Sequence, residues 1–328
     1  MIIENSTTAM ERFEARTGEY TNAAFGRVIT AMVTPFNNDD EQSLNLRCAR
    51  NLASYLSAQG SEGLVLAGTT GESPTLLWSE QMELFEAVKE VAGIPILAGT
   101  GSNSTAEVVR ATKEVTDNEL ANGLLVVSPY YNKPSQYGIV EHFKAIADST
   151  DLPIVMYNIP GRTAGMGILN DASVELSGID NIVGVKDATG DVDNAERIKR
   201  HFPEDFMIYS GDDSQNEAFA LRAGSVGAIS VASHWAGNEI AAMYDAINAG
   251  DFDRANKISR ILAKSYEFEG SAETPNPHPA KAMMRSMGID VGYGRKPMVL
   301  DPATELDLEK SACTVKGSLE KRFQTLGR

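Results

Sequence analysis

The chain has few cysteines and a deficit of basic residues. Its 328 residues include only two cysteines, Cys48 and Cys313, far apart and without CxxC spacing, so no disulfide framework is indicated. Lysine and arginine number 29 against 45 acidic residues, and the net charge of −16 argues against nucleic acid and anionic membranes as partners. No apolar run reaches the roughly 18 residues of a membrane span. These features favour a cytoplasmic protein.

Histidine is also scarce, which bears on metals and cofactors. The four histidines show no HxH or HExxH spacing, so a zinc site is not expected; they are His142, His201, His234 and His278. The acidic pair Asp212-Asp213 is a formal alternative for Mg²⁺. Asp213 followed by Ser214 is more typical of a helix N-cap. We therefore expect neither a metal nor a cofactor.

The N-terminus lacks the signs of a targeting sequence. Residues 1–25 include four glutamates, and they have neither the apolar core of a secretion signal nor the acid-poor character of a transit peptide. Hydrophobic residues make up 42% and charged residues 23% of the chain, a composition typical of globular proteins. We therefore expect residues 1–25 to form an extension of a globular cytoplasmic protein.

Short apolar runs recur roughly every 20 to 35 residues and alternate with segments of helical periodicity. Within 79–91, for example, Met82, Phe85, Val88 and Val91 fall on one helical face. Such alternation predicts parallel strands joined by right-handed crossovers. The eight runs are VITAMV (28–33), GLVLA (63–67), IPILA (94–98), GLLVV (123–127), PIVMY (153–157), IVGVK (182–186), FMIYS (206–210) and GAISV (227–231).

Eight such units predict an α/β fold of the closed (β/α)₈ TIM-barrel type over residues 26–250. An open doubly wound sheet is the alternative, but it normally has fewer strands, and no GxGxxG turn follows the first run. Residues 251–328 are helix-like throughout, with a proline-rich connector at 274–279. We interpret them as a C-terminal helical domain that packs on the barrel.

Polar and glycine-rich segments follow five of the predicted strands, where a TIM barrel carries its active site. They are GTTGE (68–72), SPYYNKP (128–134), YNIPGRT (157–163), the lysine of GVKD (184–187) and GDD (211–213). Each has a purely structural alternative. On that view the GTTGE segment is only a tight turn and Tyr157 is an aromatic residue of the core. Arg162 is a surface cation, and Lys186 marks the end of a strand. Because all of them converge on one rim of the predicted barrel, we favour a catalytic site.

These residue types permit a specific chemistry. An amine such as that of Lys186 condenses with a ketone to give a protonated imine, which acidifies the adjacent carbon. A tyrosine held by a threonine hydroxyl can relay the protons. Successive backbone amides in the turn 68–71 suit a carboxylate, and Arg162 suits a second carboxylate.

Four motifs in the same order, GTTGES, SPYYNKPSQ, YNIPGRT and GVKDATGD, resemble the dihydrodipicolinate synthase branch of the pyruvate-dependent class I aldolases, in the N-acetylneuraminate lyase superfamily. The resemblance covers residues 26–300. It implies a barrel with a C-terminal helical domain, commonly assembled as a tetramer built from tight dimers.

The resemblance also implies a role for each site residue. Lys186 forms the Schiff base with pyruvate, and Tyr157 moves protons in a relay with Thr69 and with the partner subunit's Tyr131. Thr70 and the backbone of Ile229 hold pyruvate. Arg162 receives the carboxylate of the aldehyde.

Arg162 favours L-aspartate-4-semialdehyde as the second substrate, since sialate lyases and related sugar-acid aldolases generally lack arginine there. A sugar-acid aldolase is the main alternative. A non-catalytic binding barrel is the remote one, and it would be expected to lose Lys186 or Tyr157.

In family members inhibited by L-lysine, the inhibitor binds at the tight-dimer interface. The matching residues here are Ser73, Trp78, Asn103, Glu107 and Tyr130. There are structural alternatives, because Glu107 follows Ser104 at capping-box spacing and Trp78 suits interface packing. Gln81 also stands where inhibited bacterial members often have histidine. L-Lysine as an inhibitor is therefore a further expectation.

Overall fold

The structure is a computed structural model that describes residues 23–326, so nearly all of the predicted extension, residues 1–25, lies outside the described residues. Each of the eight apolar runs forms a strand. The strands are β1 (Val28–Ala31), β2 (Gly63–Leu66), β3 (Ile96–Gly99), β4 (Gly123–Val127), β5 (Ile154–Asn158), β6 (Ile182–Asp187), β7 (Met207–Ser210) and β8 (Gly227–Ser230).

The strands form one closed parallel barrel in chain order, with β8 returning to β1. Ile29 of β1 aligns with Gly63 on one side and with Ile229 on the other, so β1 has no free edge. The predicted TIM barrel is confirmed, and the open-sheet alternative is wrong.

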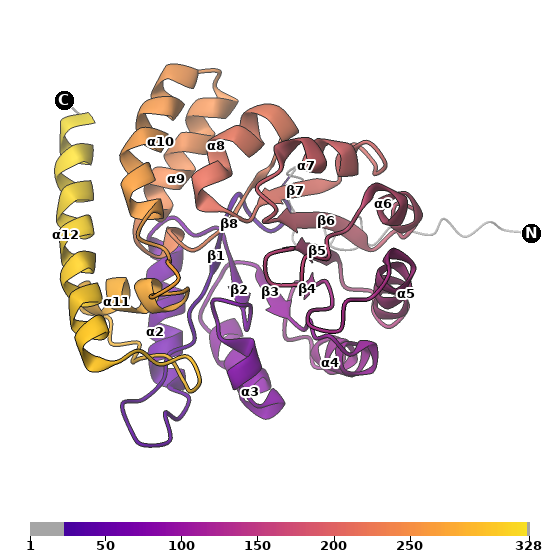
Figure 1. Cartoon of the computed structure of the whole chain (residues 1–328), viewed down its shortest axis with the longest axis horizontal. Helices are drawn as coiled ribbons and strands as arrows, with labels where there is room; N and C mark the ends of the chain where they lie inside the picture. The colour runs from indigo at the N-terminus through magenta and orange to yellow at the C-terminus, as the bar shows by residue number, and fades with distance from the viewer. Residues whose placement is uncertain (1–22, 327–328) are drawn as a thin grey trace, which may run out of the picture.

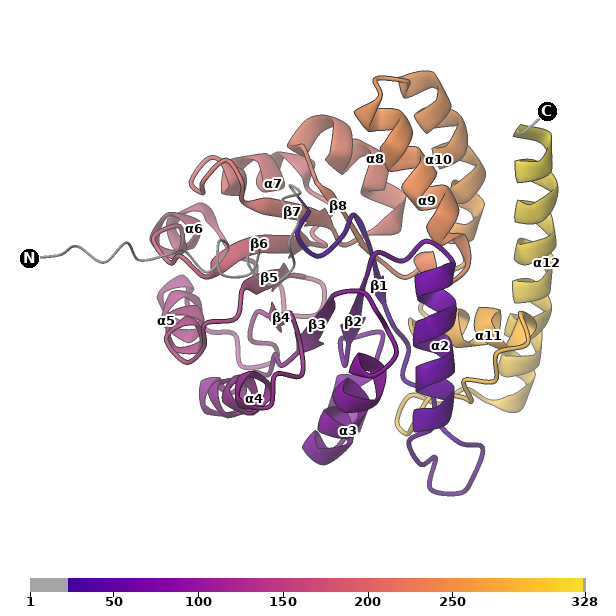
Figure 2. The same ribbon diagram turned by 180° about the vertical axis from the view of Figure 1, so that it is seen from behind.

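Helices follow the strands around the barrel (Figures 1 and 2). They are α2 (Leu46–Ala58), α3 (Trp78–Lys89), α4 (Thr105–Asp117), α5 (Gln136–Ala147), α6 (Asn170–Leu176), α7 (Val192–Lys199), α8 (Asn216–Ala218) and α9 (Ser233–Asn248). Single short turns of helix, η1 (Ser73–Thr75) and η2 (Asp213–Gln215), follow β2 and β7, and the π-helical turn η3 (Phe219–Ala223) continues α8.

Only part of the apolar face predicted for the helix over 79–91 is buried in the structure. Phe85 and Val88 of α3 are buried as expected, and Leu84 is buried with them. Val91, predicted on the same face, lies beyond the end of α3 and is 38% exposed. The chain therefore leaves the helix before the apolar pattern ends.

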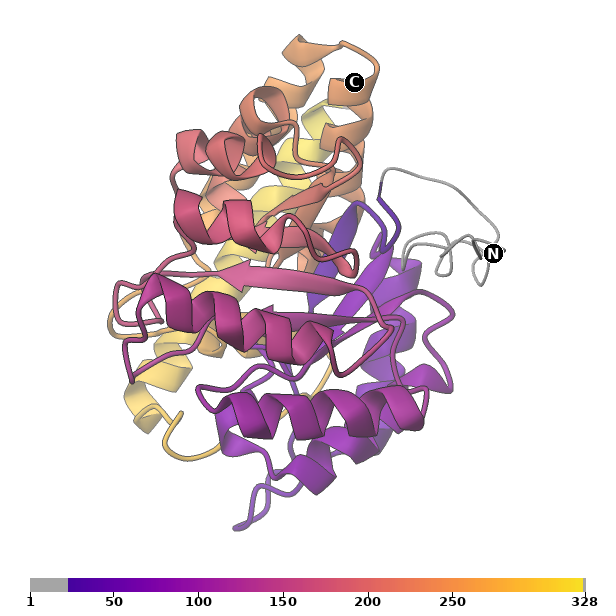
Figure 3. The ribbon, with the colours of Figure 1, turned by 90° about the vertical axis from the view of Figure 1, so that its right-hand side faces the viewer.

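The region after residue 251 contains three helices, α10 (Phe252–Tyr266), α11 (His278–Ser286) and α12 (Pro302–Leu326). α10 packs on α9, and α11 packs on α12. Figures 1 and 2 show these orange and yellow helices grouped on one side of the barrel, near α2. In the side view of Figure 3 the orange helices stand opposite the violet helices of the first half of the barrel.

Apolar residues pack on both sides of the barrel strands. One cluster lies between the strands and the surrounding helices, and Met156 and Val185 belong to it. Another fills the barrel, and it includes Val155, Tyr157 and Ile229. Because successive residues of a strand face opposite sides, Tyr157 points into the barrel while its neighbour Met156 points out.

Candidate active site

A cavity of about 200 Å³ lies at the carboxyl ends of the strands. It is lined by residues within or after β2, β3, β4 and β5, including Thr69, Tyr130, Tyr157 and Arg162. Segments that are distant in the sequence thus meet at one rim, as the parallel topology predicts.

Lys186 lies beside Tyr157. The two residues are register partners on β6 and β5. The Lys186 side-chain nitrogen is 4.4 Å from the centroid of the Tyr157 ring, and each residue is only 6% exposed. Among the described residues Lys186 forms no ion pair, so the Tyr157 ring is the group that faces its amine. A buried amine without a carboxylate partner is what an imine-forming lysine requires.

The next residue, Asp187, is directed away from that amine. Its Oδ1 accepts hydrogen bonds from the amide and the hydroxyl of Thr189, at 2.9 and 2.6 Å. Burial raises the pKa of the Asp187 carboxyl. The strand alternation therefore separates Asp187 from the reactive side of β6.

The turn 68–71 presents its two threonines differently. Thr69 lines the cavity, whereas Thr70 is buried and its Oγ1 accepts a hydrogen bond from Asn276 Nδ2 at 2.9 Å. No hydrogen bond joins Thr69 to Tyr157 within residues 23–326, although both line the same cavity. The two residues expected to form the relay therefore line one cavity, but the hydrogen bond between them is not formed in this structure.

Arg162 is exposed and lines the cavity. Its backbone amide donates to Ile159 O at 3.0 Å, which fixes the turn after β5. Within the described part of the chain its guanidinium has no ion-pair partner. It is therefore available to a carboxylate ligand. Thr163, which sequence reasoning did not single out, also lines the cavity, and only its place in the same motif would have indicated it.

Tyr131 does not line this cavity. It is 85% exposed and has a left-handed backbone, with φ of 72°. Such a conformation is uncommon for a bulky residue. Ile229, by contrast, is buried inside the barrel on β8.

The prediction that Asp213 caps a helix is wrong. The cap of η2 is Asp212, whose carboxylate accepts from Ser214 N at 3.0 Å. Asp213 is buried, and its Oδ2 accepts from the amides of Val231 and Ala232 at 2.8 and 3.0 Å. It therefore ties the end of β7 to the end of β8, a long-range role that no local pattern reveals.

A second cavity of about 290 Å³ adjoins the first. Ser73, Trp78, Glu107 and Tyr130, four of the five residues predicted to bind L-lysine, line it together. Asn103 does not line it, and its carbonyl instead accepts from Asn132 Nδ2. Ser73 and Tyr130 line both cavities, so the two spaces share a wall.

The Trp78 ring at the second cavity already contacts a cationic side chain, that of Arg110. The guanidinium carbon of Arg110 lies 5.3 Å from the Trp78 ring centroid, and Trp78 Nε1 donates to Glu114 at 2.5 Å. Sequence reasoning missed Arg110, although it stands three residues after Glu107 and thus on the same helical face.

The carboxylate of Glu107 does not take part in helix capping. Ser104 Oγ accepts from the Glu107 amide at 3.4 Å, which is the first half of a capping box. The Glu107 carboxylate accepts a hydrogen bond from Ser102 Oγ at 2.9 Å. It accepts none from the Ser104 amide, which would be the second half of the box. The carboxylate therefore remains at the cavity wall.

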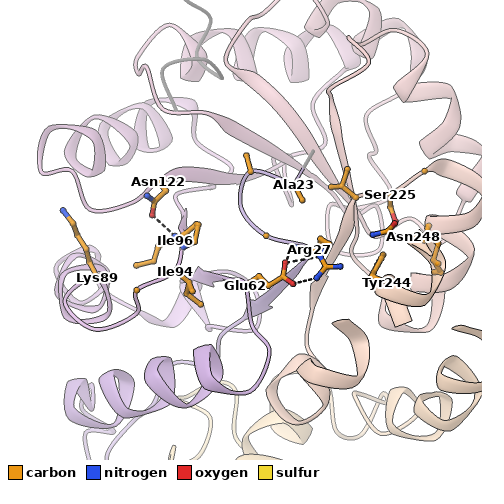
Figure 4. Close-up of a pocket in the computed structure, with 18 residues that line it drawn as sticks. Ala23, Arg27, Glu62, Lys89, Ile94, Ile96, Asn122, Ser225, Tyr244 and Asn248 are labelled. Carbon is orange, nitrogen blue, oxygen red and sulfur yellow. Dashed lines mark hydrogen bonds and ion pairs between the residues drawn. The ribbon is translucent and has the colours of Figure 1, made fainter. Parts of the chain in front are cut away.

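A larger cavity, about 1140 Å³, lies at the other end of the barrel (Figure 4). Arg27 and Glu62 form an ion pair there at 2.8 Å, and Asn122 Oδ1 accepts from the Ile96 amide at 2.9 Å. These residues precede or open strands, whereas TIM-barrel active sites lie where strands end. We therefore assign the active site to the smaller cavity. Lys186 does not line that cavity itself, but its amine contacts the ring of Tyr157, which does.

Within residues 23–326 no group of three or more His, Cys, Asp or Glu side chains is arranged to hold a metal ion. His234 is buried between strand ends. Its Nε2 accepts from the Val33 amide at 3.1 Å, and its Nδ1 lies 2.8 Å from Val231 O. None of the described helices is long and apolar enough to cross a membrane.

The model of the dihydrodipicolinate synthetase family matches residues 24–316. The chain belongs to this family. It is therefore an enzyme of the Schiff-base-forming lyase class, as the four motifs predicted.

The chain is 45% identical to 4-hydroxy-tetrahydrodipicolinate synthase 1 of Halalkalibacterium halodurans, over 84% of this chain and 91% of that protein. It is 47% identical to the synthase of a Cyanothece species, over 86% and 95%. The crystal structure of DHDPS from Cyanidioschyzon merolae with lysine bound matches with a TM-score of 0.83 and 42% identity, over 90% of this chain and 99% of that one.

Proposed function

We propose that this protein condenses pyruvate with L-aspartate-4-semialdehyde through an imine on Lys186, and so acts as a 4-hydroxy-tetrahydrodipicolinate synthase. The buried amine of Lys186 beside Tyr157 is the observation that carries the proposal. Relatives named as synthases support it. So does a structural relative from Acinetobacter baumannii, 34% identical, that was solved in complex with pyruvate.

The reaction follows from the groups around the cavity. The Lys186 amine attacks the ketone carbon of pyruvate, and the carbonyl oxygen leaves as water. Loss of a methyl proton from the imine gives an enamine, whose carbon attacks the aldehyde of the second substrate. The aldehyde oxygen gains a proton, and attack of the second substrate's amine on the imine carbon releases Lys186.

Proton transfers in this sequence are assigned to Tyr157, with Thr69 and the partner subunit's Tyr131 completing the relay. Tyr157 is assigned this role because the Lys186 amine contacts its ring. Thr70 and the Ile229 backbone are assigned to pyruvate. Arg162, exposed at the cavity and without an ion-pair partner among the described residues, is assigned to the carboxylate of the aldehyde.

Assembly and regulation are further parts of the proposal. We infer a tight dimer, within a dimer of dimers, because Tyr131 is 85% exposed and does not line the cavity of its own subunit. We infer inhibition by L-lysine at the second cavity, supported by the cluster of Ser73, Trp78, Glu107 and Tyr130. The relative from Cyanidioschyzon merolae was solved with lysine bound. A cytoplasmic location is proposed from the acidic composition and the two unpaired cysteines.

The proposal is tested by trapping the imine. The protein is incubated with pyruvate and borohydride, digested, and analysed by mass spectrometry. A stable adduct on the peptide containing Lys186, absent from Lys186→Met, is expected. An unmodified Lys186 peptide, or an adduct on another lysine, would overturn the assignment.

A further inference from the structure

The GTTGE turn ends in a carboxylate that is directed away from the cavity. Glu72 is 2% exposed and has a left-handed backbone, with φ of 54°. Its amide donates to Thr69 O at 3.1 Å, so the residue closes the turn that carries Thr69 and Thr70. A buried carboxylate in a strained backbone conformation needs a compensating partner.

That partner comes from the C-terminal helices. Glu72 Oε1 and Lys281 Nζ of α11 form an ion pair at 2.6 Å, and each side chain is 1% exposed. The other carboxylate oxygen accepts from the backbone amide of Arg295 at 2.9 Å. Two segments more than two hundred residues away in sequence thus hold the end of the turn.

The ammonium group of Lys281 is itself well fixed. It donates to Tyr293 O at 2.9 Å and lies 4.3 Å from the centroid of the Phe36 ring. Burial lowers the pKa of Lys281 to about 8, while the Glu72 carboxylate opposes that change. The ion pair is therefore rigid and shielded from water, conditions in which charge contacts are strongest.

A third contact from the same region reaches the turn directly. Asn276, two residues before α11, donates from Nδ2 to Thr70 Oγ1 at 2.9 Å. From the barrel side, Thr34 Oγ1 donates to Gly71 O at 2.6 Å. The turn is thus clamped between the barrel and the start of α11, and Glu72 is its only charged member.

We propose that the buried Glu72–Lys281 ion pair is a positioning element for the active site, through which the C-terminal helices hold Thr69 and Thr70 in place. The inference rests on the proposed function for the roles of these two threonines. Glu72 and Lys281 are positioning residues, because their side chains pair with each other and Lys281 also bonds the backbone of Tyr293, away from the substrate cavity. Small displacements of positioned groups cost large factors in rate.

The test compares Glu72→Gln with Glu305→Gln. Glu305 also pairs with α11, through Arg285 at 2.9 Å, but it does not contact the turn. Glu72→Gln is expected to raise the KM for pyruvate about tenfold or more. It is also expected to speed amide hydrogen exchange in the peptide spanning 68–73. Glu305→Gln should change neither, although both variants lower the melting temperature.

Equal behaviour of the two variants in KM and in exchange would overturn the proposal and leave the pair a stabilising contact only. If Glu72→Gln does not fold, Glu72→Asp decides by the same two measurements, because it keeps the charge but shortens the reach by one methylene. Hydrogen exchange reports on the turn whether or not an imine forms. Borohydride trapping with the unchanged protein tests the imine on Lys186 independently of the role of Glu72. Failure of the proposed function and failure of the positioning role can therefore be told apart.

Discussion

The side-chain nitrogen of Lys186 lies 4.4 Å from the centroid of the Tyr157 ring, across the register pair that joins β6 to β5. The ring covers an amine that is only 6% exposed and has no carboxylate partner among the described residues. One strand pairing therefore brings together a nucleophile and a phenol that can move protons, and it does so at the carboxyl end of the barrel.

Lys186→Arg should lower turnover by several orders of magnitude. The substitution keeps the positive charge but removes the amine that forms the imine, because a guanidinium stays protonated. Steady-state assays with both substrates measure the effect. Lys144→Arg, at a partly exposed position on α5, is the matched control and should keep full activity. Near-normal turnover of Lys186→Arg would rule out the imine mechanism.

Arg162→Ala should impair use of the aldehyde far more than binding of pyruvate. Loss of a charged, bidentate contact costs roughly 1.5–3 kcal/mol, about 10- to 150-fold in kcat/KM for the aldehyde. The KM for pyruvate should change little. Arg197→Ala, which removes an exposed partner of Asp191, serves as the control. Unchanged kinetics for the aldehyde would make Arg162 a surface residue and favour a sugar-acid aldolase.

Tyr131 should act in the partner subunit's site, and mixed oligomers test this. Tyr131→Phe and Lys186→Met are each expected to be nearly inactive. In a dimer of the two variants, the Tyr131→Phe subunit keeps Lys186 and the Lys186→Met subunit keeps Tyr131. If Tyr131 acts across the interface, one of the two sites then has both residues intact. Co-expression should therefore restore part of the activity. Mixtures with no recovery, or fully active monomers in sedimentation, would contradict the prediction.

Tyr137→Phe, at another exposed tyrosine on α5, controls for the loss of a surface hydroxyl and should remain active.

Millimolar L-lysine should inhibit the protein, and Glu107→Thr should weaken the inhibition. The Glu107 carboxylate can pair with an ammonium group of the ligand, and Tyr130 is shared by the two cavities. A coupling of about 1–3 kcal/mol is typical between such sites and is readily measured. Glu141→Thr on α5 should be inhibited like the unchanged protein. Full activity in millimolar L-lysine would leave Glu107 as a helix-end residue.

Acid should destabilise the fold through His234. Its Nε2 accepts from the Val33 amide, which requires a neutral ring, and burial lowers the pKa of His234 from its ordinary value of 6.5 to about 4. The unfolded chain binds the proton first as pH falls, so stability is lost between about pH 6.5 and 4 and is unaffected above that window. The loss amounts to at most about 3 kcal/mol.

Urea unfolding at several pH values measures this effect. His234→Gln should flatten the decline in the free energy of unfolding below pH 6.5, while the exposed His201→Gln should leave it unchanged. A residual decline is expected, since burial also lowers the pKa of His142 and His278 to about 4. An identical decline in both variants would show that His234 is not the group responsible.

The sequence by itself determined the barrel and the make-up of its active rim. Apolar runs of strand length, each separated by one helical segment, have few ways to bury both faces except as a closed parallel sheet. That topology places every strand end at one rim, so the positions of Thr69, Tyr157 and Lys186 near one another followed from their places in the chain.

Only the tertiary structure decided which side chains meet across long sequence separations. No periodicity links Glu72 with Lys281, or Asp213 with the amides of Val231 and Ala232. Such pairs depend on the packing angle of helices and on the conformation of single turns, which local propensities leave open. The partner of a buried charge is set by the packing of the whole fold. An unpaired buried charge costs more free energy than local conformational preferences contribute.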